Sequence, residues 1–374
     1  MNVLLVAEGS GGHLVPALEV AHALAERGAR IKVWYAQRPQ TARLVFALAQ
    51  EDGWHSIDVD PIPMGGASNM LGRLWRCTRL WARARRCFDS FAPDVVVGFG
   101  GLVSAPVMLA ARLRRRRIAA LLHEQNVVMG RANRLLTRWV DRVALSFPNR
   151  HATHGKTPVV LTGLPIRPAI GQAIREDAAG RFGLDPHRPT IFVLGGSQGA
   201  RAINRLMTHL VTSLSFEERA RWQILHLTGA SDEGMVRRAY ATTGITAWVA
   251  PFLTEVSAAY AHADLVIARA GASTIAELAR CGIPSLLIPY PFAGGHQRAN
   301  AQLVEACGGG LVIEESEATP ERVLREIRRL MADPARRRAM GERVRTLHAS
   351  EATTRLSEAI VELAGHRNGR PRHA

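Results

Sequence analysis

The chain has 374 residues, of which 47% are hydrophobic, and a formal net charge of +16. This length and composition exclude a disordered chain and are sufficient for two domains with full cores. The charge fits a nucleic acid, an anionic membrane surface or a phosphorylated ligand as partner, and an arginine-rich genome would produce it without any partner.

The cysteines and the apolar runs narrow the class of protein further. The four cysteines show no CxxC or metal-ligand spacing, so we expect a reduced, cytosolic protein without a disulfide framework. No run reaches the ~18 apolar residues of a transmembrane helix. The apolar run at the N-terminus is too short for a secretory signal and has no basic residues before it.

The first predicted strand, residues 3–7, leads into a glycine-rich turn and a helix. The turn contains Ser10, Gly11, Gly12 and His13, and its glycines allow the backbone to approach a ligand closely. It matches neither the dinucleotide-binding GxGxxG pattern nor a Walker motif. His13 is a candidate general base or a ligand for a phosphate or hydroxyl, and a helix cap or surface residue is the alternative.

Two more strands are predicted at residues 31–36 and 55–60. The second contains Asp-x-Asp, a motif that binds metal and diphosphate in some sugar-nucleotide enzymes. Here it alternates with Ile57 and Val59, as in an amphipathic strand. We therefore interpret it as structural.

Residues 64–91 predict a basic amphipathic helix. Six arginines lie between Arg73 and Arg86. The apolar stripe is formed by Leu71, Leu74, Trp75 and Trp81. Arginine and tryptophan on such a helix are typical of a membrane interface, and a core-facing helix with a solvated arginine face is the alternative.

A second strand–turn–helix unit spans residues 93–113, with glycines in the turn at 98–104. Five arginines follow between Arg112 and Arg117. The next strand ends in HEQN, which places the acid Glu124 and the amide Asn126 at a strand's carboxyl end, where a substrate site is expected in an α/β sheet.

The segment 148–171 is rich in Pro, Gly and Thr, and the run TGLPIRPAI within it, residues 162–170, is the predicted linker between domains. Arg167 lies in this run, and we expect it to face a cleft between the two domains. After the linker, a strand at 190–194 enters a third glycine turn that includes Ser197 and Gln198.

A strand at residues 264–268 begins the last prominent unit. Gly271 allows a tight turn, and Ser273 or Thr274 is expected to cap the following helix. The open N-terminus of this helix suits a phosphate, and Glu277, one turn inside, is expected to reach a ribose hydroxyl pair. An ordinary turn with a surface glutamate is the alternative.

Repetition of strand, glycine turn and helix in both halves predicts an α/β fold of two doubly wound, parallel-sheet, Rossmann-like domains that face each other across a cleft. We expect an N-terminal domain at residues 1–165 and a C-terminal domain at 166–347. A final helix near 348–364 is expected to pack back on the N-terminal domain. The glycine turns favour a nucleotide-type ligand.

Together the motifs resemble the MurG family of UDP-N-acetylglucosamine-dependent transferases, in segments such as EGSGGHLVPALEVAHAL, HEQN, TGLPIR, LGGSQGARAIN and HQRANA. The resemblance implies the GT-B architecture. It also implies transfer of GlcNAc from UDP-GlcNAc to the 4-hydroxyl of the MurNAc of undecaprenyl-pyrophosphoryl-MurNAc-pentapeptide (lipid I), which gives lipid II for peptidoglycan synthesis.

The resemblance also implies roles for residues. His13 and Glu124 match polar positions near the acceptor and are the candidate catalytic groups. Glu277 matches the ribose-binding acid, and Leu253 would contact the uracil through its backbone. The implied substrate-binding positions are Ser10, Gly11, Gly12, Asn126, Arg167, Ser197, Gln198, Leu253, Gly271, Ala272, Ser273, Thr274, Glu277, His296 and Gln297. The departures from the family include EGSGGH in place of GGTGGH and GGLVSAP in place of GGYVSGP.

The implied reaction is a direct displacement with inversion, in which a base removes the proton of the acceptor hydroxyl. We expect no metal and no cofactor, no nucleic-acid partner, and peripheral attachment to anionic lipids at the cytoplasmic face of the membrane. The alternatives are another glycolipid glycosyltransferase or a UDP-sugar epimerase of the same fold. A nucleic-acid-binding protein would leave the glycine turns unexplained.

Overall fold

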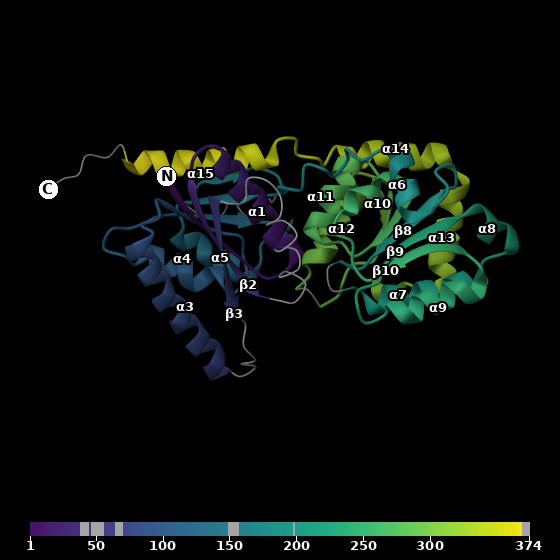
Figure 1. The fold of residues 1–374 in the computed structure, drawn as a ribbon, viewed down its shortest axis with the longest axis horizontal. Helices are drawn as coiled ribbons and strands as arrows, with labels where there is room; N and C mark the ends of the chain where they lie inside the picture. The colour runs from purple at the N-terminus through teal and green to yellow at the C-terminus, as the bar shows by residue number, and fades with distance from the viewer. Residues whose placement is uncertain are drawn as a thin grey trace. The chain divides into compact units, whose positions relative to one another are not determined.

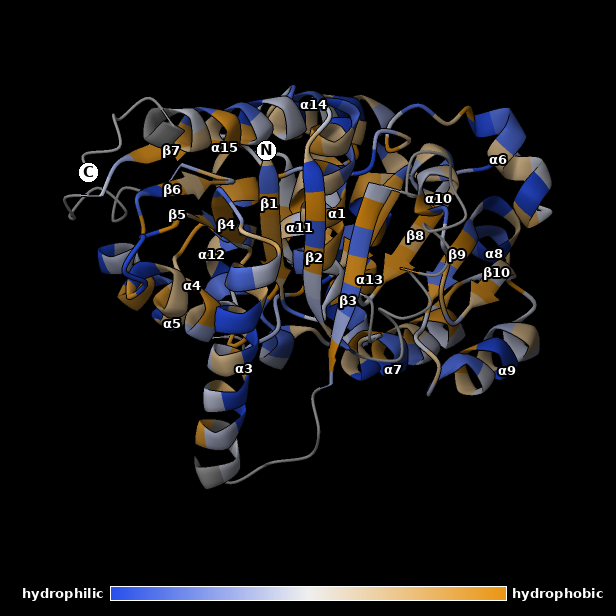
Figure 2. Ribbon diagram, turned by 60° about the vertical axis from the view of Figure 1, so that its left-hand side comes forward, coloured by the Kyte–Doolittle hydropathy of each residue, from blue (hydrophilic) through white to orange (hydrophobic). Residues whose placement is uncertain are grey.

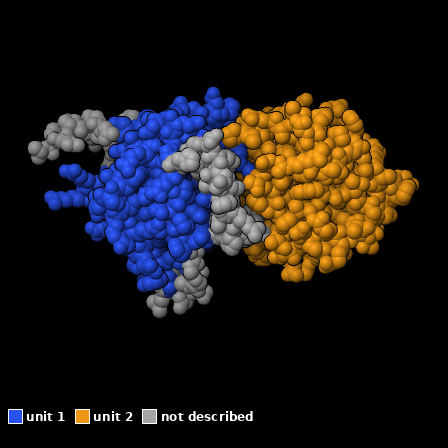
Figure 3. Space-filling model, in the orientation of Figure 1, with its two compact units in different colours: residues 1–167, 349–374 blue, residues 168–348 orange. Residues whose placement is uncertain are grey.

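The computed structural model describes residues 1–37, 45, 56–63, 70–148, 157–196, 199–292 and 294–368 (Figure 1). The chain divides into two compact units (Figure 3). Unit 1 contains Met1–Arg167 and Ala349–Ala374, and unit 2 contains Pro168–His348. Each unit is built on its own parallel sheet.

The sheet of unit 1 has seven strands in the order β3-β2-β1-β4-β5-β6-β7, and all neighbours are parallel. The strands are β1 (Asn2–Ala7), β2 (Arg30–Gln37), β3 (Ile57–Pro63), β4 (Val95–Gly98), β5 (Ala119–Glu124), β6 (Arg142–Leu145) and β7 (Val159–Leu161). The helices are α1 (Gly11–Glu26), α3 (Met70–Ser90), α4 (Ser104–Arg112), α5 (Arg131–Leu136) and α15 (Ala352–Asn368).

Both faces of this sheet are buried, because side chains alternate along each strand. Val3 and Leu5 of β1 pack in one core with helix α1, which Leu356 of α15 also joins. Leu4 packs on the opposite face in a core shared with α3 and α4. The continuous apolar run VLLVA is therefore the expected sequence of a strand covered on both sides (Figure 2).

The sheet of unit 2 has six parallel strands in the order β10-β9-β8-β11-β12-β13. The strands are β8 (Thr190–Leu194), β9 (Gln223–Leu227), β10 (Thr246–Ala250), β11 (Leu265–Ala268), β12 (Ser285–Leu287) and β13 (Gly310–Val312). The helices are α6 (Arg175–Phe182), α7 (Arg201–Leu210), α8 (Phe216–Arg221), α9 (Glu233–Thr243), α10 (Val256–His262), α11 (Ala272–Cys281), α12 (His296–Ala306), α13 (Pro320–Ala332) and α14 (Pro334–Arg345).

Counted along the chain, the first six strands of each sheet have the same order: third, second, first, fourth, fifth, sixth. In unit 1, β7 adds a seventh strand beside β6. The shared order is the strand order of a Rossmann-type sheet. The prediction of two doubly wound parallel-sheet units is confirmed.

Helix α3 differs from the sequence prediction in the direction that Trp81 faces. Leu80, Ala84, Cys87 and Phe88 form its buried side, and Trp81 packs against the same core. The predicted stripe containing Trp81 is therefore wrong, because burial of the 80–84–87–88 side rotates Trp81 toward the core. Leu74 and Trp75 are 63% and 61% exposed. The side chains of Leu71 and Arg73, and residues 64–69, lie outside the described part of the chain.

Candidate functional site

In both sheets the strand order reverses between two neighbouring central strands, β1 and β4 in unit 1 and β8 and β11 in unit 2. In open α/β sheets, ligands bind outside the carboxyl ends of the strands at this switch point. The first and second glycine turns follow β1 and β4, and the third glycine turn and the Gly271 turn follow β8 and β11. The sequence-predicted residues of these four turns thus fall at one switch point in each unit, whereas Glu124 and Asn126 follow β5 and Leu253 follows β10.

The first glycine turn holds a serine–histidine pair. Ser10 precedes α1 in an extended conformation and makes no side-chain cap bond. Its hydroxyl lies instead 2.6 Å from Nδ1 of His13. Gly11 and Gly12 are the first residues of the helix and His13 is the third. His13 therefore does not cap the helix, and its Nδ1 is engaged by Ser10, which orients the ring.

The second glycine turn lies directly against the first. Gly101 has φ +82, and a Cβ there would lie 2.2 Å from Oε2 of Glu8. A Cβ on Gly100 would lie 3.5 Å from Cδ2 of His13 and 3.2 Å from Nδ2 of Asn133. Ser104 donates a hydrogen bond to the carbonyl of Gly100 (2.7 Å) and secures the turn. A side chain on Gly101 would collide with Glu8, and the φ of +85 at Gly100 disfavours any residue other than glycine.

Glu8 was not among the sequence-predicted site residues. It occupies the first position of the glycine turn, and its side chain lies against Gly101. The signal that could have found it is the departure from the family pattern, in which EGSGGH stands where GGTGGH is usual.

Glu124 is buried at the carboxyl end of β5, and its carboxylate accepts four hydrogen bonds. Oε1 accepts from the backbone and the amide side chain of Asn126 at 2.9 and 3.2 Å. Oε2 accepts from the backbone of Gly130 at 3.1 Å and from the side chain of Asn133 at 2.8 Å. The carboxylate thereby organises the loop 125–133 and sets the position of Asn126.

His123 precedes Glu124 but takes part in a different set of contacts. Its Nε2 lies 3.1 Å from Oγ of Ser146 and 3.4 Å from the carbonyl of Gly163. Its ring packs edge-on against Phe99. Burial lowers the pKa of His123 to about 4. The histidine of HEQN is therefore a neutral, buried group. It is Glu124, Asn126 and Asn133 that form the hydrogen bonds of the loop 125–133.

In unit 2, Gly199, the last residue of the third glycine turn, packs against the end of β9. Gly199 has φ +76, and a Cβ there would lie 2.3 Å from the carbonyl oxygen of Thr228. This position requires glycine for both its conformation and its packing. Ser197 and Gln198, which the sequence assigned to substrate binding, lie outside the described residues.

The helix α11 begins two to three residues earlier than predicted, because its N-cap is Gly271 and not Ser273 or Thr274. Gly271 is its N-cap in an extended conformation, and no side chain caps it. The expectation that Ser273 or Thr274 caps the helix is wrong, because both lie within the first turn after Ala272. The N–H groups of this first turn are therefore left without a side-chain cap, which suits an anion.

Glu277 lies in the second turn of α11. The hydroxyl of Tyr260, from α10, donates a hydrogen bond of 2.7 Å to its Oε2. Tyr260 is fully buried, so it fixes the orientation of a partly exposed carboxylate. This arrangement distinguishes Glu277 from an unrestrained surface glutamate.

The remaining predicted residues lie at loops and helix starts. His296 begins α12, and Gln297 accepts a hydrogen bond of 2.9 Å from the backbone N–H of Tyr290. Leu253 is half-buried in the loop between β10 and α10. Arg167 is the last residue of the first segment of unit 1.

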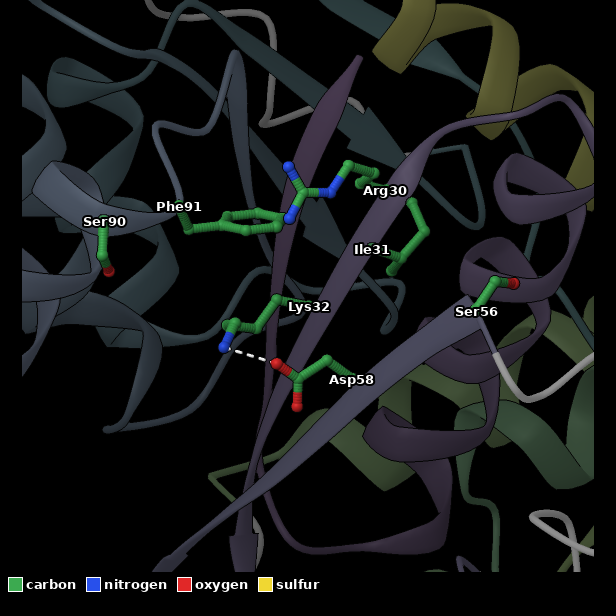
Figure 4. Close-up of a pocket in the computed structure, with 7 residues that line it drawn as sticks. All are labelled: Arg30, Ile31, Lys32, Ser56, Asp58, Ser90 and Phe91. Atoms are coloured by element: carbon green, nitrogen blue, oxygen red, sulfur yellow. Dashed lines mark ion pairs between the residues drawn. The ribbon is translucent and has the colours of Figure 1, made fainter.

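A cavity of about 310 Å³ lies at the other end of the unit 1 sheet (Figure 4). It is lined by the amino ends of β2 and β3 and the last turn of α3. Lys32 pairs there with Asp58 at 2.5 Å and with Asp60 at 3.7 Å. Burial lowers the pKa of Lys32, but the two carboxylates outweigh it and raise the pKa overall. Both acids of the Asp-x-Asp motif are thus paired within the fold, as its structural interpretation predicts.

No group of three or more His, Cys, Asp or Glu side chains in the described part of the chain is placed to hold a metal ion. No helix in the described ranges is both long and apolar enough to cross a membrane.

Comparison with known proteins finds two matching domain families. Residues 3–145 match the Glycosyltransferase family 28 N-terminal domain, and residues 190–358 match the Glycosyltransferase family 28 C-terminal domain.

Individual relatives match over nearly the whole chain. A UDP-N-acetylglucosamine--N-acetylmuramyl-(pentapeptide) pyrophosphoryl-undecaprenol N-acetylglucosamine transferase of Mesorhizobium japonicum is 37% identical, covering 98% of this chain and 96% of its own length. A protein of the same name from Desulforudis audaxviator is 35% identical over 98% of this chain and 99% of its own. The crystal structure of Acinetobacter baumannii MurG superimposes with a TM-score of 0.74 at 27% identity, covering 96% and 99% of the two chains.

Proposed function

Because the chain belongs to glycosyltransferase family 28, we propose that it transfers N-acetylglucosamine from UDP-GlcNAc to undecaprenyl-pyrophosphoryl-MurNAc-pentapeptide, the reaction for which its relatives are named. The observation that carries the proposal is the 37% identity over 98% of the chain. Glycine turns at the switch points of both sheets support it, since the reaction needs two ligand sites.

Unit 2 is the proposed site of the sugar nucleotide. The uncapped start of α11 supplies backbone N–H groups and a favourable dipole to the diphosphate. Glu277 accepts hydrogen bonds from the ribose, and the backbone of Leu253 contacts the uracil. The third glycine turn and Gln297 complete the contacts with the diphosphate and sugar.

Unit 1 is the proposed site of the acceptor. His13 acts as general base: with Nδ1–H donated to Ser10, Nε2 accepts the proton of the acceptor 4-hydroxyl. The hydroxyl oxygen forms a bond with the anomeric carbon as the bond to the UDP oxygen breaks, which inverts the configuration. The negative charge that develops on UDP is stabilised by backbone N–H groups of the glycine turns and helix starts.

The direct test is transfer of labelled GlcNAc from UDP-GlcNAc to a lipid I analogue in detergent. We expect labelled lipid II and free UDP in equal amounts. Release of UDP without a glycolipid product, or conversion of UDP-GlcNAc into an epimer, would contradict the proposal and favour the epimerase alternative.

Glu277→Ala tests the donor site. Loss of the carboxylate is expected to weaken UDP binding by about 1.5–3 kcal/mol, the range for a hydrogen bond to a charged group. Isothermal calorimetry with UDP measures this. Tyr260→Phe is the matched variant, because it keeps the carboxylate but releases its orientation, and its effect should be smaller. Equal UDP affinity in the wild type and in Glu277→Ala would contradict the assignment.

We also propose that unit 1 binds an anionic membrane surface through the exposed end of α3. Leu74 and Trp75 are exposed there, and the guanidinium of Arg79 lies over the Trp75 ring at 4.6 Å. Not every arginine of the two basic segments contributes: Arg114 and Arg117 pair with Asp89 and Asp141. The exposed arginines that remain in the described segments are Arg79, Arg85, Arg86, Arg115 and Arg116.

Flotation with vesicles tests this surface. Each arginine near an anionic bilayer adds about 1 kcal/mol within a Debye length, so high salt should weaken binding. Apolar insertion by Leu74 and Trp75 should leave a salt-resistant part. The double variant Leu74→Ser, Trp75→Ser is expected to lose that part while UDP binding is retained.

The control is Phe216→Ser, which removes an aromatic side chain that is 78% exposed on unit 2. It should bind vesicles like the wild type. Equal flotation with neutral and anionic vesicles, or no flotation with either, would contradict the proposal and show that these arginines are ordinary solvated surface residues.

A further inference from the structure

A line of buried polar side chains crosses unit 2 from α9 through β9 to α7. The hydroxyl of Tyr240 lies 2.7 Å from Nδ1 of His226, whose Nε2 lies 3.0 Å from Oδ1 of Asn204. Nδ2 of Asn204 then lies 2.8 Å from the carbonyl of Thr228 and 2.8 Å from Oδ2 of Asp232. Tyr240, His226 and Asn204 are each at most 2% exposed.

The direction of each hydrogen bond in this line is determined. The carbonyl of Thr228 and the carboxylate of Asp232 accept, so the amide nitrogen of Asn204 donates to both. The amide oxygen of Asn204 must then accept from Nε2–H of His226. Burial lowers the pKa of His226 to about 3, so its ring is neutral and Nδ1 accepts from Tyr240. Every member has one role, and reversing one bond would break its neighbours.

The line of hydrogen bonds ends at the Thr228 carbonyl and the start of α7, which lie beside Gly199. The carbonyl of Thr228 is the group against which Gly199 packs, because a Cβ at Gly199 would lie 2.3 Å from it. Asn204 belongs to the start of α7, where its backbone N–H donates to the carbonyl of Ala200 at 2.9 Å. Asn204 therefore contacts the Thr228 carbonyl through its side chain and the first turn of α7 through its backbone.

We propose that Tyr240, His226 and Asn204 are positioning residues, which hold Gly199 and the start of α7 in the geometry that binds the donor diphosphate. This rests on the proposed function, which places the donor in unit 2. None of the three needs to touch the nucleotide. Their effect passes through the Thr228 carbonyl and the backbone of Gly199–Ala200.

The opposite end of β9 offers a matched control. Gln223 is also fully buried, and its Nε2 donates to the carbonyl of Asp185 at 2.6 Å and to Oγ1 of Thr190 at 2.9 Å. It lies at the amino end of the strand, away from the glycine turn. Gln223→Leu and His226→Leu both remove a buried polar side chain from the same strand. Only His226→Leu removes the hydrogen bond to Asn204, which contacts the Thr228 carbonyl beside Gly199.

The experiment measures the dissociation constant of UDP, the two KM values and the melting temperature for both variants. We expect His226→Leu to weaken UDP binding about tenfold or more, equal to about 1.4 kcal/mol or more, and to raise KM for UDP-GlcNAc but not for the lipid acceptor. Gln223→Leu should lower the melting temperature comparably and leave UDP binding unchanged. A similar loss of UDP affinity in both variants would overturn the proposal.

Two further variants protect the test against simple misfolding. His226→Gln retains an N–H donor that can reach Asn204, so it should recover part of the UDP affinity that His226→Leu loses. Tyr240→Phe removes only the bond to Nδ1 and should give a smaller loss in the same direction. UDP affinity in His226→Gln no better than in His226→Leu would contradict the directional chain of bonds.

Amide hydrogen exchange separates this inference from the proposed function. In the protein without nucleotide, the amides of residues 199–204 should exchange faster in His226→Leu than in the wild type and in Gln223→Leu. If the wild-type protein binds no UDP, the proposal that unit 2 binds the donor is refuted. The exchange rates would still show whether His226 holds residues 199–204 in place. Unchanged exchange at residues 199–204 would refute the positioning role even if the enzyme transfers GlcNAc.

Discussion

His13→Ala is expected to lower kcat by about 10²–10⁴-fold, the usual contribution of a positioned general base. The ring is held 2.6 Å from the hydroxyl of Ser10 at a glycine turn, so its orientation is set before the acceptor binds. Because the proton is transferred only in the reaction step, KM for UDP-GlcNAc should change little. Steady-state kinetics with a lipid I analogue, together with thermal unfolding, measures both effects.

His22→Ala is the control for this prediction. His22 lies on the same helix, half-exposed, with its Nε2 3.4 Å from Glu26, and its removal should leave kcat unchanged. Ser10→Ala should fall between the two, because the base remains but its orientation is freer. A loss of melting temperature in His13→Ala with normal turnover per folded molecule would assign His13 to folding.

Glu124→Gln is the second large effect that we expect. The carboxylate accepts from four donors in loop 125–133, and a glutamine would turn its own NH₂ group toward two of them. The unsatisfied, buried donors should cost about 2–4 kcal/mol of stability. Activity should fall as well, because Asn126 loses both of its bonds to the carboxylate or keeps them at the expense of Gly130 and Asn133.

The combination of stability and turnover decides between two roles for Glu124. A group that acts only as a base would tolerate the isosteric amide without loss of melting temperature, while kcat fell. A positioning group would lose both together. Glu362→Gln is a suitable control, since it removes an exposed ion pair with Arg142 and should cost at most about 1 kcal/mol.

The sequence predicts the two sheets well because their signals are local. A run such as VLLVA followed by glycines specifies a buried strand and a tight turn without information from distant residues. The start of α11 was predicted less accurately. Ser273 and Thr274 are good capping residues. However, β11 ends at Ala268 and Gly271 is the extended N-cap, so the helix has already begun before either residue.

The contacts that shape the site depend on residues distant in sequence, so no local pattern reveals them. Glu8 contacts Gly101 across 93 positions, and the line from Tyr240 to Asn204 needs α7, β9 and α9 assembled together. Trp81 is a similar case. An aromatic residue beside arginines fits either a membrane face or a core, and only the packing of Leu80 and Phe88 decides.

Because unit 1 includes α15, the two units are not completed in the order in which the ribosome begins them. Unit 2 is one continuous segment, Pro168–His348, whereas unit 1 needs residues on both sides of it. Leu356 and Ile360 of α15 are fully buried in the core that contains β1. During translation unit 2 can therefore finish folding while unit 1 still exposes an apolar face beside α1. This face stays exposed until α15 has been synthesised and packs against it.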